Sequence, residues 1–391
     1  MNYILFDSDV RNSLLPFTYT RPVADIRIGI LTIREKWEFF LGFTTTTITE
    51  EYLEDKYPMV ELNKNILINA SFLPTKNLVK QVSNLSKNQA IFQGEQVVAF
   101  FTSDTQENVD FDSYEQLEFK EEVLQIKNTW DIFSLNDKAI QADFDLLTEG
   151  RTSQPIPSGV HAIQKQNIFI EQGATISYSS LNASKGPIYI GKDSEIMEGS
   201  LVRGPFALGE NSILKMVTKV YGATSVGPFC KVGGEINNSV LFGYSSKGHE
   251  GFLGNSVLGE WCNIGADSNT SNLKNNYAEV KLWNYQEERF INTGLQFCGL
   301  MMGDHSKCGI NTMFNTGTVI GVSANIFGSG FPRNFVPSFS WGGAAGFTAY
   351  QIKKVFEVAK VVMKRRGLEL TETDKKILHH VFDETSKNRT S

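Results

Sequence analysis

The strongest constraint on the fold is a branched aliphatic residue at every sixth position from 190 to 232. The repeated residues are Ile190, Ile196, Val202, Leu208, Leu214, Val220, Val226 and Val232. A period of six fits neither a helix nor an alternating strand, so it indicates an internal repeat. We expect each unit to form one side of a three-sided coil, with its aliphatic residue inside. Stacked coils of this kind make a parallel β-helix.

The period is already in phase at Ile170 and Ile176, and we expect the β-helix to span residues 151–335. It breaks after Val232 and after Ile264, resuming 26 and 38 residues later, in each case two more than a multiple of six. Insertions in solenoids commonly loop out and carry functional residues.

We therefore predict two surface loops, one within residues 246–252 and one within residues 267–293.

The composition narrows the class of protein. A length of 391 residues predicts two or three domains. Lys and Arg number 37 against 43 acidic residues, a net charge of -6, which gives no reason to expect nucleic acid or a membrane surface as partner. No apolar run is long enough to span a bilayer, and the first residues do not resemble a signal peptide. We expect a cytoplasmic protein that acts on small molecules.

The four cysteines lack zinc-finger spacing, and three of them fall on repeat positions: Cys230, Cys262 and Cys308. These three are expected to be small buried thiols in a reducing compartment. The sequence predicts no metal site.

Residues 1–150 alternate strand and helix signals, which favours an α/β domain. Strands are predicted at 3–6, at 66–69 and on either side of a turn within 90–101, and helices at 30–41 and 134–147. A Pro- and Ser-rich linker at 152–159 separates this domain from the repeat.

Two short motifs in this first domain resemble those of sugar-1-phosphate nucleotidyltransferases. Residues 14–18 read Leu-Leu-Pro-Phe-Thr, and residues 21–22 read Arg-Pro. The glycines that this family places before them are replaced by Ser-Asp-Val-Arg at 8–11, which removes the close approach of backbone N–H groups to phosphate. Ser71 stands where the family has a metal-binding Asp, and a hydroxyl is a poorer Mg²⁺ ligand. The resemblance therefore implies a reduced, degenerate domain that uses Mg²⁺ only if it is active.

Two arginines in this region are candidate phosphate-binding residues. Arg11 and Arg21 lie in a polar segment, and a guanidinium can hold phosphate with two hydrogen bonds. The alternative is that they are solvated or pair with Asp7, Asp9 and Asp25.

The second resemblance lies in the repeat. Residues 235–238 (Glu-Ile-Asn-Asn), 248–249 (Gly-His), 253–255 (Leu-Gly-Asn) and 263–272 follow the order and spacing of one known pattern. They resemble the acetyltransferase half of the bifunctional N-acetylglucosamine-1-phosphate uridyltransferase/glucosamine-1-phosphate acetyltransferases. The domain order agrees as well. The resemblance implies a left-handed parallel β-helix and a homotrimer whose active sites are shared between neighbouring helices.

It also implies a set of site residues. His249 matches the general base that deprotonates the sugar ammonium so that the amine attacks acetyl-CoA. Asn263 and Asn272 match sugar-binding residues, and Lys231 takes the place of an Arg that meets the sugar phosphate. Asn237 stands at a substrate-binding position where the family has a phosphate-binding Lys.

Departures from the pattern leave the function open. Besides Asn237, Phe252 replaces a family Tyr and Leu273 replaces another, and each lost polar contact is worth about 1–3 kcal/mol. The alternative for His249 is an exposed loop residue beside Glu250.

Two further residue pairs are noted. Asp304 and His305 could act together, but we expect an ordinary solvent-facing pair. Trp261 and Trp283 could line a groove for coenzyme or sugar, although packing under a loop is the commoner role of such aromatics.

Residues 336–391 are expected to cap the open end of the solenoid and then form two helices. The first spans 350–366 and has a basic face that we expect to be solvated. The second opens with a capping box at Thr371 and Asp374.

Three functional hypotheses follow. The first is an acyl-CoA-dependent transferase of sugar-nucleotide metabolism, which the resemblance connects with UDP-N-acetylglucosamine and the cell envelope. The second is nucleotidyltransferase activity in the first domain. The third is a non-catalytic sugar-nucleotide sensor or scaffold.

Overall fold

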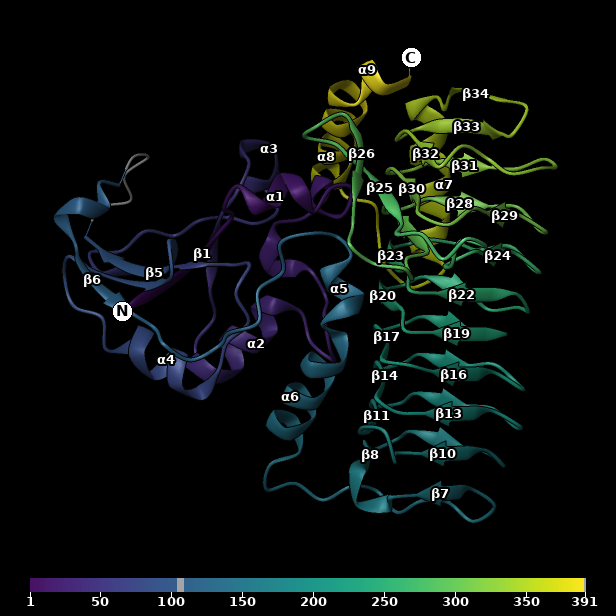
Figure 1. Cartoon of the computed structure of the whole chain (residues 1–391), viewed down its shortest axis with the longest axis horizontal. Helices are drawn as coiled ribbons and strands as arrows, with labels where there is room; N and C mark the ends of the chain where they lie inside the picture. The colour runs from purple at the N-terminus through teal and green to yellow at the C-terminus, as the bar shows by residue number, and fades with distance from the viewer. Residues whose placement is uncertain (104–108, 390–391) are drawn as a thin grey trace.

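The computed structural model describes residues 1–103 and 109–389. An N-terminal α/β domain is followed by a three-sided parallel β-helix and by C-terminal helices, as Figure 1 shows. The predicted fold class is therefore confirmed. Within the described ranges, no helix has the length and apolar character needed to cross a membrane.

The N-terminal domain contains one mixed sheet in the order β2-β1-β3-β5-β4-β6. Its strands are β1 (Asn2–Phe6), β2 (Thr46–Ile48), β3 (Asn65–Asn69), β4 (Gln89–Gln93), β5 (Gln96–Thr102) and β6 (Glu115–Glu118). Strand β3 is buried along its whole length because side chains cover both of its faces. The helices are α1 (Val10–Ser13), α2 (Ile33–Leu41), α3 (Glu51–Glu54), α4 (Lys76–Ser83), α5 (Asp131–Ser134) and α6 (Asn136–Thr148).

The β-helix has three faces, which we name A, B and C in chain order within a coil. Face A consists of β7 (His161–Ile163), β10 (Ser180–Asn182), β13 (Leu201–Arg203), β16 (Lys219–Tyr221), β19 (Glu235–Asn237) and β22 (Phe252–Gly254). Face B consists of β8 (Ile168–Ile170), β11 (Ile188–Ile190), β14 (Phe206–Leu208), β17 (Thr224–Val226), β20 (Val240–Gly243), β23 (Val257–Glu260), β27 (Leu300–Met302), β30 (Thr318–Ile320) and β32 (Phe335–Val336). Face C consists of β9 (Thr175–Ile176), β12 (Glu195–Ile196), β15 (Ile213–Leu214), β18 (Lys231–Val232) and β21 (Ser246–Lys247), and it continues in β28 (Lys307–Cys308), β31 (Asn325–Ile326) and β33 (Ser340–Gly343).

The residues that recur with the six-residue period form the column of side chains that point into the β-helix. Successive coils pair in register, so Ile190 lies opposite Leu208, 18 residues later. Both are fully buried, as is Ile196 on the next face. All four cysteines are buried free thiols, as predicted for three of them.

The first break in the period is a shortening and not an insertion. Leu241 lies opposite Val226 after 15 residues, and Leu258 lies opposite Leu241 after 17. The expected loop at 246–252 is therefore wrong, because this segment forms β21, a tight corner and β22. The inward position on face C is taken by Lys247, opposite Val232, and its polar side chain hid the repeat.

The second break is an insertion, as predicted. Between β24 (Asn269–Thr270) and β27 the chain leaves the coil and forms an antiparallel hairpin, β25 (Lys281–Asn284) with β26 (Arg289–Asn292). Strand β24 pairs with β29 (Met313–Phe314) of the next coil.

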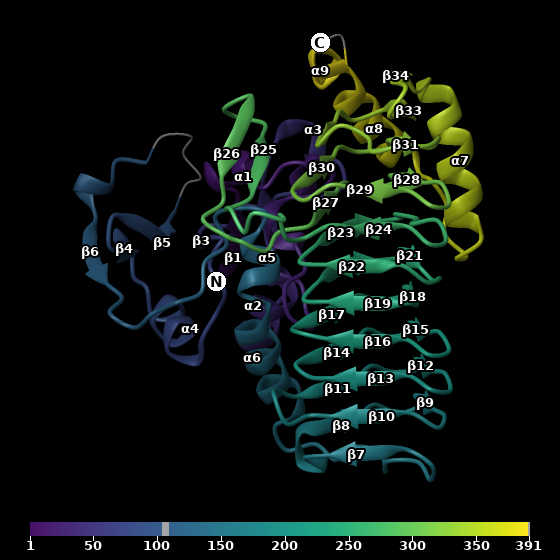
Figure 2. The ribbon, with the colours of Figure 1, turned by 45° about the vertical axis from the view of Figure 1, so that its right-hand side comes forward.

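The N-terminal domain packs against face B. Phe144 and Ile30 contact Phe169 and Tyr189 in one cluster. Higher up, the Phe17 ring lies 5.3 Å from that of Phe242. Figure 2 shows α6 running along this face beside β8, β11 and β14. Buried residues of the two parts belong to one continuous hydrophobic core.

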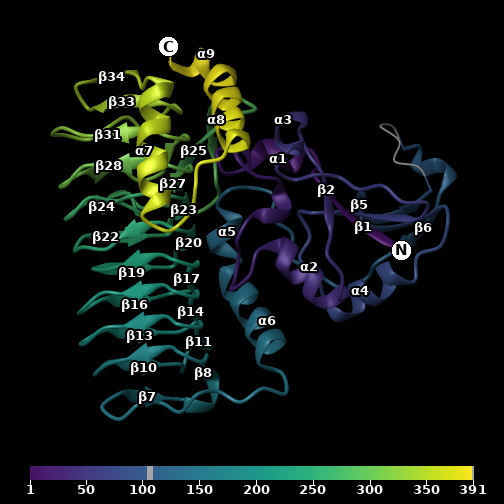
Figure 3. The same cartoon turned by 180° about the vertical axis from the view of Figure 1, so that it is seen from behind.

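The C-terminal segment closes the upper end of the solenoid. Strand β34 (Gly346–Ala349) forms a hairpin with β33, which pairs with β31. Helix α7 (Ile352–Lys364) crosses the upper part of face C (Figure 3), and α8 (Glu372–Glu384) and α9 (Ser386–Arg389) follow. The predicted capping box of Thr371 and Asp374 is present at the start of α8.

Candidate functional site

The carboxyl end of β1 carries a buried, internally bonded aspartate. Asp7 accepts hydrogen bonds from the Val23 N–H at 2.8 Å and the Thr49 hydroxyl at 2.7 Å. Burial is the main effect on this group and raises the pKa of Asp7 to about 6, despite the hydrogen bonds that lower it. The neighbouring Arg11 Nε lies 3.5 Å from the carboxylate.

Arg11 is held inside the domain and not presented to solvent. It donates to the Thr18 carbonyl at 2.8 Å and to the Tyr52 hydroxyl at 2.7 Å. Its pairing with Asp7 is one of the alternatives that the sequence left open. Phosphate binding by Arg11 stays a prediction, and it would require these contacts to break.

Arg21 joins the N-terminal domain to the β-helix. Its guanidinium forms an ion pair with Asp304 and lies 3.4 Å from the Glu260 carboxylate, while Thr20 donates to Asp304 at 2.7 Å. Arg21 is only 4% exposed, so a phosphate would have to displace a carboxylate to reach it. Its phosphate-binding role likewise stays a prediction.

The expectation of a solvent-facing Asp304–His305 pair is wrong. Asp304 is 3% exposed because the N-terminal domain covers it, and Arg21 is its charge partner. The His305 backbone N–H donates to the Glu260 carbonyl at 2.8 Å. Burial lowers the pKa of His305 to about 3, so its imidazole is neutral at physiological pH.

The end of β3 does not fit a magnesium ion. Ser71 is 1% exposed, and its hydroxyl donates to the Asn69 side-chain oxygen at 2.8 Å. The Ser8 hydroxyl donates to the same oxygen at 3.3 Å. The nearby carboxylate of Asp7 is already bonded, and residues 1–103 and 109–389 contain no group of three or more His, Cys, Asp or Glu side chains placed to hold a metal.

The predicted base lies at the corner between faces C and A. His249 is exposed, in the tight turn that joins β21 to β22. The turn is bounded by Gly248 and by Gly251, whose φ of +113° a residue with a side chain rarely adopts. A Cβ added at Gly251 would lie 2.1 Å from the Ser268 carbonyl, so the backbone of the next coil also requires glycine there.

A buried cation holds this corner. Lys247 is 1% exposed, and its ammonium donates to the carbonyls of Gly233 at 3.0 Å, His249 at 2.5 Å and Glu250 at 3.2 Å. Burial lowers the pKa of Lys247 to about 8. Sequence reasoning missed this residue, and its only signal was a Lys at the point where the aliphatic period failed.

Two predicted residues lie in the column next to this corner. Successive coils of face C place three residues one above another, because Lys231 pairs with Ser246 and Ser246 pairs with Asn263. A Cβ built on Gly248 would come within 3.9 Å of the Lys231 Cβ. The structure thus brings Lys231 and Asn263 to the same edge of the prism as His249.

The other two predicted residues lie at the opposite edge of face A. Asn237 ends β19 and packs against Gly222 at the corner between faces A and B. The Asn272 amide donates to the Asn255 side-chain oxygen at 2.8 Å. Within one chain, face A separates this pair from the His249 corner. The functional roles of all five residues stay predictions.

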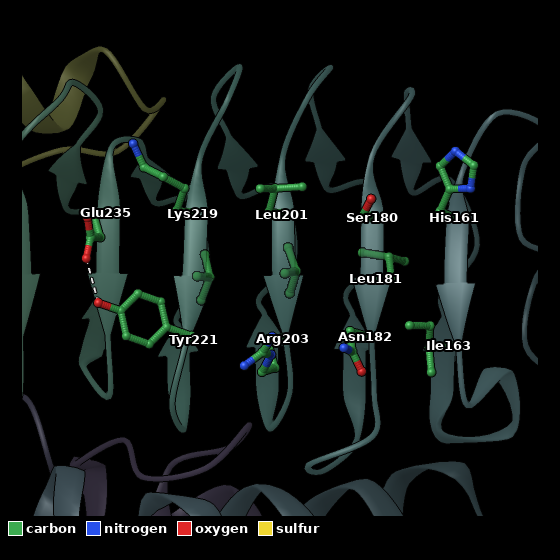
Figure 4. Close-up of a pocket in the computed structure, with 12 residues that line it drawn as sticks. His161, Ile163, Ser180, Leu181, Asn182, Leu201, Arg203, Lys219, Tyr221 and Glu235 are labelled. Carbon is green, nitrogen blue, oxygen red and sulfur yellow. Dashed lines mark hydrogen bonds between the residues drawn. The ribbon is translucent and has the colours of Figure 1, made fainter.

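Face A carries a shallow groove of about 580 Å³ between these edges (Figure 4). Its floor includes the exposed apolar side chains of Ile163 and Leu201. At one end the Tyr221 hydroxyl donates to Glu235 at 2.5 Å. Lys219 in the groove also lies 3.4 Å from Glu250, the neighbour of His249, so groove and corner are continuous.

Comparison with known proteins agrees with this division of the chain. Residues 3–152 match a family model described as sugar nucleotidyl transferase. A bifunctional sugar-1-phosphate nucleotidylyltransferase/acetyltransferase of Sulfurisphaera tokodaii is 30% identical over 149 residues, 37% of this chain and 36% of that protein.

Two proteins named bifunctional protein GlmU match longer segments. That of Synechococcus elongatus is 22% identical over 52% of this chain and 46% of its own, and that of a Nostoc species is 26% identical over 58% and 52%. The chain therefore spans about a third to a half of the length of these relatives.

Solved structures that match part of this chain include UDP-N-acetylglucosamine acyltransferases from Arabidopsis and Campylobacter jejuni. The first has a TM-score of 0.26 at 16% identity and covers 60% of this chain and 98% of its own. The second has a TM-score of 0.27 at 10% identity and covers 57% and 95%. The resemblance predicted from the motifs is therefore confirmed: residues 3–152 match the sugar nucleotidyl transferase family model, and longer segments are distantly similar to bifunctional nucleotidyltransferase/acetyltransferases.

Proposed function

We propose that this protein is a transferase of sugar-nucleotide metabolism that moves an acetyl group from acetyl-CoA to an amino-sugar phosphate or nucleotide sugar. The observation that carries the proposal is the His249 corner. An exposed imidazole sits on a backbone fixed by Lys247, with Lys231 and Asn263 beside it. A fixed backbone keeps a catalytic group in position without an ordering cost at each turnover.

The chemistry requires one base. The His249 imidazole takes a proton from the acceptor ammonium, and the free amine attacks the thioester carbon. The new N–C bond forms as the C–S bond breaks, and the proton that the amine nitrogen then loses passes to the departing thiolate of coenzyme A. In this proposal Lys231 neutralises the phosphate of the acceptor next to that base.

The arrangement of the remaining residues supports a homotrimer. Asn237 and Asn272 lie across face A from His249, so one chain cannot bring the two edges to a single small substrate. A neighbouring copy against face A would place its own edge beside His249. The exposed apolar side chains of Ile163 and Leu201 would then be covered.

Acetyl transfer is tested by thiol release. Wild type and His249→Ala are incubated with acetyl-CoA and a panel of amino-sugar phosphates and nucleotide sugars. We expect at least a 100-fold loss in the variant, in the range of a lost general base. His379→Ala, an exposed histidine on α8, is the matched control and should retain full activity. Equal release by both variants would remove His249 from the mechanism.

The assembly is tested separately by light scattering after size exclusion. Wild type should have the mass of three chains, and Leu201→Asp should dissociate because it places a charge in the apolar part of face A. Val361→Asp, at a position on α7 that is also more than half exposed, should stay trimeric. A trimer that survives Leu201→Asp would exclude face A as the interface.

A second candidate is a binding or scaffolding role for the N-terminal domain. It is favoured by the internal bonds of Ser71, Arg11 and Arg21, which occupy the groups that a nucleotidyltransferase would use. We expect no pyrophosphate release from UTP or dTTP with sugar-1-phosphates and Mg²⁺. Sustained release would assign nucleotidyltransferase activity to this domain.

A further inference from the structure

The inserted hairpin β25–β26 builds one wall of a large cavity whose lining does not include His249. The hairpin stands out beside the upper coils, next to β30 (Figure 2). The cavity measures about 740 Å³, and its other walls are the segment before β32 and the start of α9. Its volume is in the range of sites for small organic ligands.

One part of the cavity is aromatic. The Trp283 indole is stacked on Phe335, with ring centroids 4.2 Å apart and planes 11° apart. Phe290 meets Trp283 edge-on at 5.4 Å and is 39% exposed. Two flat surfaces at a steep angle to each other suit a planar ring, which can stack on one and meet the edge of the other.

The choice of tryptophan is itself informative. The Trp283 Nε1 is buried and has no hydrogen-bond acceptor in the described parts of the chain. A buried donor without a partner costs about 1–3 kcal/mol, and phenylalanine would fill the wall without that cost. Packing alone therefore does not explain the indole, whereas its larger stacking surface serves a ligand.

The other part of the cavity is cationic. Arg333 is exposed and takes part in none of the ion pairs or hydrogen bonds found among residues 1–103 and 109–389. The carboxylate of Glu288 is neutralised by an ion pair with Lys387. The cavity thus keeps the positive charge of a guanidinium, which binds phosphate oxygens in pairs.

We propose that this cavity binds a nucleoside phosphate, with the base against Trp283 and Phe290 and the phosphate on Arg333. The cavity volume exceeds the volume of a single sugar phosphate, and the lining combines an aromatic surface for stacking with one guanidinium. The same chemistry occurs in a nucleotide sugar and in the adenosine phosphate part of coenzyme A. The experiment separates these two sources.

Binding to the full-length chain is measured by isothermal titration without metal. The probes are UDP-N-acetylglucosamine, coenzyme A, uridine, adenosine, pyrophosphate and glucosamine-1-phosphate. We expect UDP-N-acetylglucosamine, coenzyme A or both to bind. The nucleoside of the ligand that binds (uridine or adenosine) and pyrophosphate should each bind at least tenfold more weakly. Stacking of one base is worth about 1–3 kcal/mol, a factor of about 5 to 150.

Three variants complete the test. Trp283→Leu and Arg333→Gln should each weaken binding of the nucleotide at least fivefold, while Arg365→Gln, at the exposed position that follows α7, should not. His249→Ala should bind as wild type does, so loss of acetyl transfer and loss of this site are distinguishable. The proposal is overturned if neither nucleotide binds, or if Trp283→Leu and Arg333→Gln bind the nucleotide as tightly as wild type does.

Discussion

Lys247 makes the most quantitative prediction, because a cation occupies a position that the coils otherwise fill with aliphatic residues. Its pKa falls from 10.5 to about 8 in the folded chain, chiefly through burial. Between these values the unfolded chain binds more protons than the folded one, so stability rises with pH in this window. One pKa unit is worth 1.36 kcal/mol, so the whole effect is about 3 kcal/mol, of which about 2.5 kcal/mol falls between pH 7 and pH 10.

The perturbation is Lys247→Met, which keeps the length of the side chain and removes its proton. Urea unfolding of wild type and variant is measured with a reductant present at pH 7, 8, 9 and 10. Other titrating groups are common to both proteins and cancel in the difference. Relative to the variant, wild type should gain about 2.5 kcal/mol between pH 7 and pH 10.

Lys192→Met removes an exposed lysine and is the control, with a difference from wild type that stays nearly constant with pH. A constant difference for Lys247→Met as well would refute the reasoning. It would mean that hydration or the three carbonyl contacts offset the effect of burial and keep the pKa of Lys247 near its usual value.

Three further predictions concern stability and are measured by chemical denaturation. Arg21→Met should destabilise the chain by about 3–5 kcal/mol because it leaves Asp304 charged, buried and unpaired, and Arg21→Met with Asp304→Leu should recover most of this loss. The folded chain holds the Asp7 proton up to about pH 6, so wild type loses stability as the pH rises and this proton is released. Because Asn does not titrate, the unfolding free energy of Asp7→Asn should rise by about 2 kcal/mol relative to that of wild type between pH 4 and pH 7. Thr371→Ala should cost about 1 kcal/mol by removing the cap of α8, and no loss would show that docking alone fixes that end. A rise in stability for Arg21→Met would contradict the first of these predictions. A stability difference between Asp7→Asn and wild type that does not change with pH would contradict the second.

The coils could be predicted from the sequence because stacking demands an aliphatic residue at every inward position. The prediction failed where an inward position holds a polar residue. Lys247 is inward and polar, and the 15-residue coil before it shifts the count, so a shortened coil was taken for an insertion. No local pattern shows that three backbone carbonyls will surround the ammonium.

The site was predictable only in part. The candidate role of His249 came from the resemblance, and its exposure was the alternative that the sequence left open. By contrast, Asp304 owes its burial to Arg21, which is 283 residues away in another domain. The separation of Asn237 from His249 by the width of face A depends on how the chain is wound, and the order of residues along the sequence does not reveal it.

The covering of two sides of the prism has a consequence for how copies can assemble. Face B is closed by the N-terminal domain and the upper part of face C by α7, which leaves face A as the longest open side of the described chain. In an assembly whose copies contact one another through face A, the N-terminal domains would lie on the outside and point away from the shared axis. The size of those domains then sets no limit on how closely the prisms approach, and the outside stays accessible to whatever the N-terminal domains bind.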